Sequence, residues 1–133
     1  MKYICIVFLF ICTCVKAADW QLYFEGAGRI GEKYYVDQTS ITRLRNGNVK
    51  LWERQIANQE GPLPMKDFGG GLLNLYEIDC SERKYRQLAM RPITPTFDNM
   101  KAINKMEEYF KEWQEFMPND LYEARLHVWC GVK

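Results

Sequence analysis

Residue types that carry much of protein chemistry are scarce in this sequence. It contains one histidine, His127, and five cysteines among 133 residues, and its 18 Lys and Arg nearly balance its 17 Asp and Glu. This balance excludes a broad basic field of the kind that holds nucleic acid or an anionic membrane surface. No nucleophile stands beside a base, no cluster has metal-ligand spacing, and no glycine-rich stretch has the residues of a phosphate site. We therefore expect neither an enzyme nor a bound cofactor.

The longest apolar run lies at the N-terminus and predicts a targeting segment. A positive start, an apolar stretch and small residues before a cleavage site follow one another in residues 1–17. Lys16 ends the run short of the roughly 20 apolar residues that span a bilayer. We expect a signal peptide that is cleaved after Ala17 or Ala18, and a single exported domain over residues 18–133.

A lipid anchor is the alternative for this segment, because Cys12 and Cys14 lie late in the apolar run. Ile11 and Thr13 precede them, where a lipid-attachment motif usually has a small residue. The sequence therefore favours a periplasmic or secreted protein over one attached to the outer surface, and it predicts no stable membrane span.

Cleavage of the leader would remove three cysteines and leave Cys80 and Cys130. An even pair in an exported chain predicts a disulfide, because the compartment is oxidising. Such a bond would fasten the last element of the chain to the end of a central strand.

Five segments of the exported part have the alternating or β-branched pattern of strands. They are residues 19–25, 32–37, 48–56, 72–80 and 83–91. Asn46 and Gly47 predict a tight turn before the third segment. Residues 26–31 match G-x-G-x-x-G, but a strand pattern follows them instead of a helix, so we predict a hairpin turn and no dinucleotide site.

The segment 72–80 carries apolar residues on both faces. Tyr76 and Ile78 share one face, and Leu73 and Leu75 point the other way. This pattern predicts a central strand, or a strand whose outer face meets a partner.

Helical spacing begins after the strands. Apolar residues recur every three or four positions over residues 99–117, which predicts a helix that Pro118 ends. Asp120 and Glu123 then form the D-x-x-E pattern of a capping box at the start of a last helix, and Gly131 is a stop signal.

Two carboxylates invite a catalytic interpretation. Glu77 and Asp79 lie two residues apart, as a pair in a glycoside hydrolase could. Ion pairing with Arg83 and Arg86 on a neighbouring strand explains them more simply.

Candidate ligand contacts lie in a loop and on one strand. The loop of residues 58–71 is long and rich in glycine and proline, and it contains Phe68. Arg83, Arg86 and Arg91 would form a positive strip beside an aromatic sheet surface, where tyrosine and tryptophan favour contact with a partner.

Four groups of residues stand in a fixed order from Trp20 to Cys130. They are Tyr34 to Asp37 with Ser40, Ile41 and Arg43; Val49, Leu51 and Trp52; Tyr76 to Cys80 with Arg83, Tyr85 and Arg86; and Trp113, Pro118, Asp120 and Glu123 before Cys130. Their order and spacing resemble the bacterial surface-adhesin protein E family.

The resemblance implies an antiparallel sheet of about six strands, with a C-terminal helix held on its concave face by a disulfide. We therefore predict an α+β fold of about five to six antiparallel strands, with the C-terminal helix or helices packed on one face and tied by that bond. Relatives usually have a short polar strand where residues 100–110 show helical spacing, so the sequence leaves helix or strand open within residues 99–117.

The resemblance also implies a surface or periplasmic location and attachment to host matrix proteins. The resulting hypothesis is an exported, non-enzymatic module that binds a protein or another macromolecule. The alternative is a periplasmic structural or assembly component with no adhesive role. An open sheet edge would also allow a homodimer.

Overall fold

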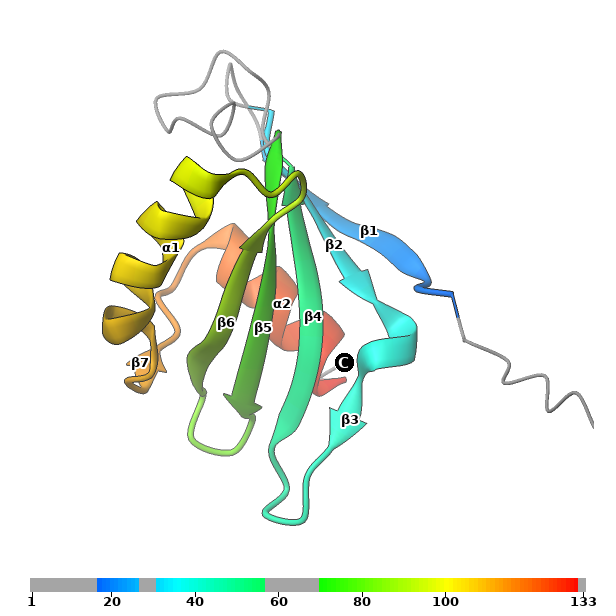
Figure 1. The fold of residues 1–133 in the computed structure, drawn as a ribbon. Helices are drawn as coiled ribbons and strands as arrows, with labels where there is room; N and C mark the ends of the chain where they lie inside the picture. The colour runs from blue at the N-terminus through cyan, green and yellow to red at the C-terminus, as the bar shows by residue number, and fades with distance from the viewer. Residues whose placement is uncertain (1–16, 27–30, 57–69, 132–133) are drawn as a thin grey trace, which may run out of the picture.

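The strand segments form one antiparallel sheet in the computed structural model (Figure 1). The structure describes residues 17–26, 31–56 and 70–131. Its elements in chain order are β1 (Trp20–Glu25), β2 (Lys33–Asp37), the 3-10 turn η1 (Gln38–Ser40), β3 (Thr42–Arg43), β4 (Val49–Ile56), β5 (Gly71–Asp79), β6 (Lys84–Pro92), α1 (Phe97–Phe110), β7 (Gln114–Glu115) and α2 (Asp120–Cys130). The α+β class is confirmed.

In the described part of the chain, the sheet has the strand order β1-β2-β4-β5-β6-β7, with the short β3 paired to β4. Strand β5 pairs with β4 on one side and with β6 on the other along nearly its whole length. It is therefore a central strand, as its two apolar faces predicted. The turn before β4 is also confirmed, since Gly47 has a φ of +88° and Asn46 accepts a hydrogen bond from the Asn48 amide.

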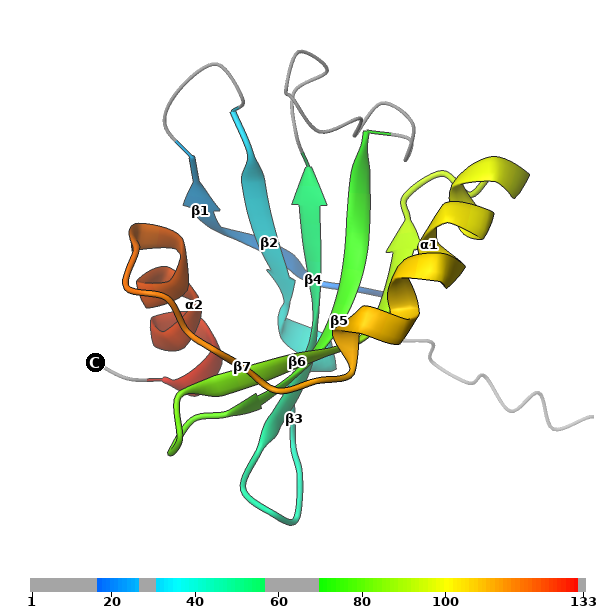
Figure 2. The same ribbon diagram turned by 90° about the vertical axis from the view of Figure 1, so that its left-hand side faces the viewer.

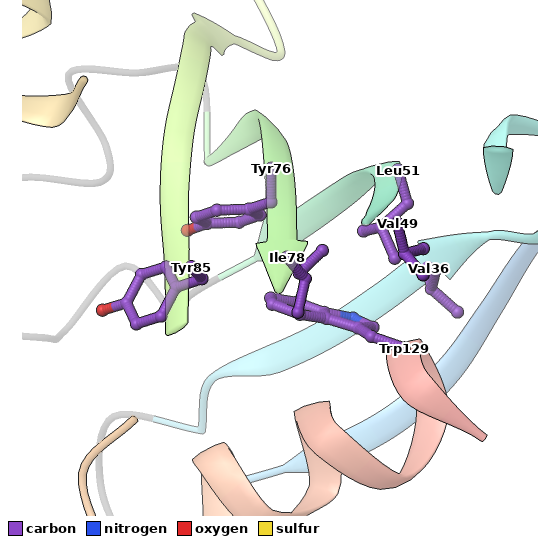
Figure 3. Packing of buried hydrophobic residues seen from close by; sticks show 7 residues of the cluster. All are labelled: Val36, Val49, Leu51, Tyr76, Ile78, Tyr85 and Trp129. Carbon is purple, nitrogen blue, oxygen red and sulfur yellow. The ribbon is translucent and has the colours of Figure 1, made fainter. Parts of the chain in front are cut away.

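One face of the sheet, here called the inner face, is covered by α2. Its buried cluster contains Val36, Val49, Leu51, Tyr76, Ile78 and Tyr85 from the strands and Trp129 from the helix (Figure 3). Trp129 is 2% exposed, and its ring centroid lies 5.1 Å from that of Tyr76. Burying this large ring, together with Leu126 of the same helix, is the apolar contribution of α2 to the core.

The disulfide between Cys80 and Cys130 is confirmed. It joins the residue after β5 to the last residue of α2, with a Cα–Cα distance of 5.7 Å. The last helix is thus attached to the sheet both by the packing of Trp129 and by a covalent bond.

The start of α2 lies one residue before the predicted position. Asn119 is the N-cap, and its side chain accepts a hydrogen bond from the Tyr122 amide. The prediction of Asp120 as the cap was wrong, because an asparagine directly before it takes the role equally well. Gly131 ends the helix in the left-handed conformation, as predicted.

The prediction of one helix over residues 99–117 was only partly right. Helix α1 starts earlier, at a capping box between Thr96 and Asn99, and it ends at Phe110. Gln114 and Glu115 then form β7, which pairs with the start of β6. Hydrogen bonds to an open strand therefore replace the last turns of the predicted helix, and both a helix and a short strand lie in this region.

The two helices occupy different places along the sheet. Figure 2 shows α2 on one side of the strands and α1 beside the end of β6. Ile103 anchors α1 and is fully buried.

Candidate functional site

The second face of the sheet, here called the outer face, carries aromatic and aliphatic side chains. Antiparallel register assigns residues to it, because directly paired residues point to the same side and neighbours in a strand point to opposite sides. The pairs Leu22–Tyr35, Arg54–Leu73 and Trp52–Leu75 lie on this face. The outer-face residues used below are Trp20, Leu22, Tyr35, Trp52, Arg54, Leu73, Leu75, Ala89 and Arg91.

This outer face lacks a helical layer over β2, β4 and β5 in the part of the chain that the structure describes. Helix α2 packs on the inner cluster, and α1 packs beside β6. Trp52, Leu73 and Leu75 are only partly buried, whereas their neighbours Leu51 and Tyr76 on the inner face are buried. The apolar side chains of the outer face therefore remain accessible to a partner.

Arg54 is the most unusual residue of this face. Its guanidinium carbon lies 4.9 Å from the ring centroid of Trp20 and 4.6 Å from that of Tyr35. Two such cation–π contacts restrict the side chain. Its Nε is buried and has no hydrogen-bond partner among the described residues.

Two of the predicted contact arginines are ion-paired within the domain. Arg83, in the turn between β5 and β6, lies 3.0 Å from Glu123 of α2. Arg86 lies 2.7 Å from Glu77 across the β5–β6 pair, and its guanidinium stacks at 4.8 Å on the ring of Trp113. Both side chains therefore have structural partners.

The predicted arginine strip does not form as one group. Arg91 is exposed at the far end of β6, and it pairs with Leu73, four positions along β5 from the Glu77–Arg86 pair. That separation is about 14 Å at 3.4 Å per residue. Phe68, the fourth predicted contact, lies outside the described residues, as does most of its loop.

The carboxylate pair Glu77 and Asp79 also has structural partners. Glu77 accepts hydrogen bonds from Asn48 and Arg86, which together outweigh its burial and lower its pKa. Asp79 accepts hydrogen bonds from Ser81 and from the amide of Glu82, and these lower its pKa. Both carboxylates therefore stay ionised and stabilise the β5–β6 hairpin.

The inner face holds a buried ion pair that sequence reasoning missed. Arg125 of α2 donates to both carboxylate oxygens of Glu53 on β4, at 3.1 and 2.7 Å. The two side chains are 7% and 0% exposed. Tyr23 of β1 donates a hydrogen bond to the same carboxylate. This network connects β1 and β4 to the last helix.

Protonation in this network is set by burial and by the ion pair. Burial raises the pKa of the Tyr23 phenol, and the neighbouring Glu53 raises it further, so the hydroxyl remains a donor. Burial alone would lower the pKa of Arg125, but attraction to Glu53 and the nearby phenols raises it above its usual range. Arg125 is therefore always charged, and Glu53 balances that charge.

The contacts of Arg54 with Trp20 and Tyr35 were also not predicted from the sequence. A partial signal was present in the sequence, since Trp52 and Arg54 alternate with the buried Leu51 and Glu53 in a predicted strand. The sequence does not show that strand pairing brings Trp20, which lies on a different strand, into contact with the Arg54 guanidinium.

Residues 17–26, 31–56 and 70–131 contain neither a candidate metal site nor a membrane-spanning helix. In these ranges, no three His, Cys, Asp or Glu side chains gather in a way that could hold a metal ion. None of the helices there is long and apolar enough to cross a membrane.

The fold and this face together define a disulfide-tied α+β domain in which, among the described residues, α2 covers one sheet face and no helix layers the other over β2, β4 and β5. The family model described as Surface-adhesin protein E matches residues 20–131. The chain therefore belongs to the surface-adhesin protein E family, which confirms the resemblance seen in the sequence. Searches among curated proteins and among solved structures returned no match.

Proposed function

We propose that this chain is an exported, non-enzymatic binding module that attaches to a host or matrix protein through the outer face of its sheet. The observation that carries the proposal is the partly exposed apolar surface of this face over β4 and β5, where Trp52 pairs with Leu75. Membership of a surface-adhesin family supports a binding role.

The residue types of the outer face suit a protein interface. Tryptophan, tyrosine and arginine are enriched among the residues that dominate binding energy. Trp20 and Tyr35 each contact the Arg54 guanidinium, and Leu22, which pairs with Tyr35, is 49% exposed. A partner that covers these side chains would gain roughly 25 cal/mol for each Å² of apolar surface removed from water.

A periplasmic structural or assembly component is the second candidate. Ile11 and Thr13, which precede the leader cysteines, favour it, because neither is the small residue of a lipid-attachment motif. Under this reading the outer face would dock on another envelope protein or on a second copy of the chain.

The first experiment compares two exposed apolar residues. Leu22 on the outer face is 49% exposed and Met106 on α1 is 41% exposed, so a glutamate at either position should leave the fold intact. Purified wild type, Leu22→Glu and Met106→Glu are tested for binding to immobilised matrix proteins. Loss of binding with Leu22→Glu alone is expected, and equal binding by all three proteins would refute the use of the outer face.

The second experiment separates the two candidates. Protease or antibody access to the protein is measured on intact and on permeabilised cells. Access on intact cells is expected for an adhesin, whereas protection until permeabilisation would leave the periplasmic component. Sedimentation of the wild type and Leu22→Glu would show whether the same face forms a homodimer.

A further inference from the structure

Two arginines of the outer face differ from the other cations described above. Arg83, Arg86 and Arg125 each pair with a carboxylate of the domain. Among the described residues, neither Arg54 nor Arg91 has such a partner. Arg91 is exposed and Arg54 is partly exposed, so both can meet an anionic group from outside.

Register places the two arginines in one row. Arg54 on β4 pairs with Leu73 on β5, and Leu73 pairs with Arg91 on β6. Two strand spacings of about 4.8 Å separate the arginine backbones by about 10 Å. An apolar side chain thus lies midway between two cations, on the same face.

The side chain of Arg54 is restricted before any ligand binds. The rings of Trp20 and Tyr35 restrict its guanidinium, so little side-chain freedom remains to be lost on binding. A planar guanidinium offers paired donors that match a carboxylate.

We propose that Arg54, Leu73 and Arg91 form a recognition site for an acidic segment of a partner protein, in which two carboxylates flank an apolar side chain. The inference rests on the proposed function and names the chemistry of the partner. An acidic protein segment fits better than a sulfated polysaccharide because the floor between the arginines is Leu73, with Leu75 and Trp52 in the adjoining row. A sugar chain has no side chain to bury there.

The probe is a blocked peptide with the core Glu-Thr-Leu-Thr-Glu, and its control is Gln-Thr-Leu-Thr-Gln. In an extended strand alternate side chains share a face, so the two carboxylates flank the leucine. Each peptide is titrated into the isotope-labelled, disulfide-bonded domain and followed by NMR. Saturable shifts at Arg54 Nε–H, the Trp20 indole and the Leu73 methyls are expected with the glutamate peptide only.

The variants are Arg54→Gln, Arg91→Gln and, as a matched control, Arg83→Gln. Loss of one charged hydrogen-bonding partner should weaken peptide binding about tenfold or more for the first two. Arg83→Gln removes an exposed arginine that is already paired with Glu123, and it should leave the affinity unchanged. Because Arg91 is exposed, its variant remains informative if Arg54→Gln disturbs the sheet.

Several results would overturn the proposal. They are the absence of saturable shifts, equal binding of the glutamine peptide, and equal weakening by Arg83→Gln. A heparin fragment that binds at these residues while the peptide does not would also overturn it, in favour of a polysaccharide. If Arg54→Gln and Arg91→Gln leave the Leu22-dependent binding of matrix proteins intact, this inference fails while the proposed function stands.

Discussion

Replacing Glu53 by glutamine should strongly destabilise the domain. The substitution preserves shape but leaves the guanidinium of Arg125, which is 7% exposed, without an anion. Two unit charges about 4 Å apart at an effective dielectric constant near 20 attract by about 4 kcal/mol. Removing one partner of a buried pair typically costs about 3–5 kcal/mol. That is a large share of the roughly 5–15 kcal/mol total of a small domain.

The assay is urea unfolding of the disulfide-bonded protein, followed by tryptophan fluorescence, for wild type, Glu53→Gln, Arg125→Met and the double variant Glu53→Gln/Arg125→Met. Each single variant should lose about 3–5 kcal/mol, and the double variant should lose much less than their sum because it buries no charge. Single losses below about 1 kcal/mol, or additive losses in the double variant, would refute a role for the ion pair in holding α2.

Three further predictions concern other parts of the fold. Replacing both Cys80 and Cys130 by serine should cost about 4 kcal/mol in urea unfolding, since the bond closes a loop with a sequence separation of 50; unreduced wild type should weigh two hydrogens less than reduced protein, and free thiols would contradict this. Because the folded pKa of Glu77 lies below its unfolded value, Glu77 contributes to the free energy of unfolding above about pH 4.3, and this contribution is lost as the pH falls through the folded pKa. Glu77→Gln should therefore reduce the loss of stability at acid pH, and an unchanged acid dependence would contradict this role of Glu77. Gly71→Ala should cost about 1–3 kcal/mol in the same assay, because the new Cβ would overlap the carbonyl oxygen of Gln55, and unchanged stability would show that the strands separate easily.

Much of the fold could be predicted because its signals are local. Alternating side chains identify strands, and Asn46-Gly47 identifies the turn before β4 whatever the remainder of the chain does. The disulfide followed from counting the cysteines that removal of the expected signal peptide would leave. These features depend on a few neighbouring residues or on composition.

The ends of the helices were harder to predict than their presence, because groups elsewhere in the chain compete for the backbone hydrogen bonds of the terminal residues. The apolar spacing continues through Trp113, but β7 ends up extended beside β6. Likewise, Asn119 and Asp120 are both good caps, and the sequence alone does not choose between them. The helix pattern carries no information about an open strand edge nearby.

Pairing between distant side chains was not predictable from one sequence. Glu53 and Arg125 are 72 residues apart, and nothing local marks them as partners. Arg83 was expected to face a ligand, whereas the start of α2 brings Glu123 to it. Candidate sites chosen by residue type alone therefore included arginines that the fold already neutralises.

Two β-bulges decide which residues share the outer face. In β1 the register shifts between Leu22 and Phe24, so Phe24 pairs with Tyr34 on the inner face while Leu22 stays outside. In β6 the extra residue Leu88 has the same kind of effect, because Gln87 pairs with Tyr76 and Ala89 with Leu75.

The bulge in β6 is what makes a two-arginine row possible. In an unbroken register Arg91 would oppose Leu72 and point to the inner face, since a slip of one residue turns side chains over. With the bulge it opposes Leu73, whose other neighbour is Arg54. Glu53 and Arg54 are neighbours on β4 and point to opposite faces of the sheet. Glu53 pairs with Arg125 within the core, whereas Arg54 meets no carboxylate in the described part of the chain. Arg54 and Arg91 thus share one face and one row with Leu73 because of this bulge, and the proposed site for an acidic segment rests on that arrangement.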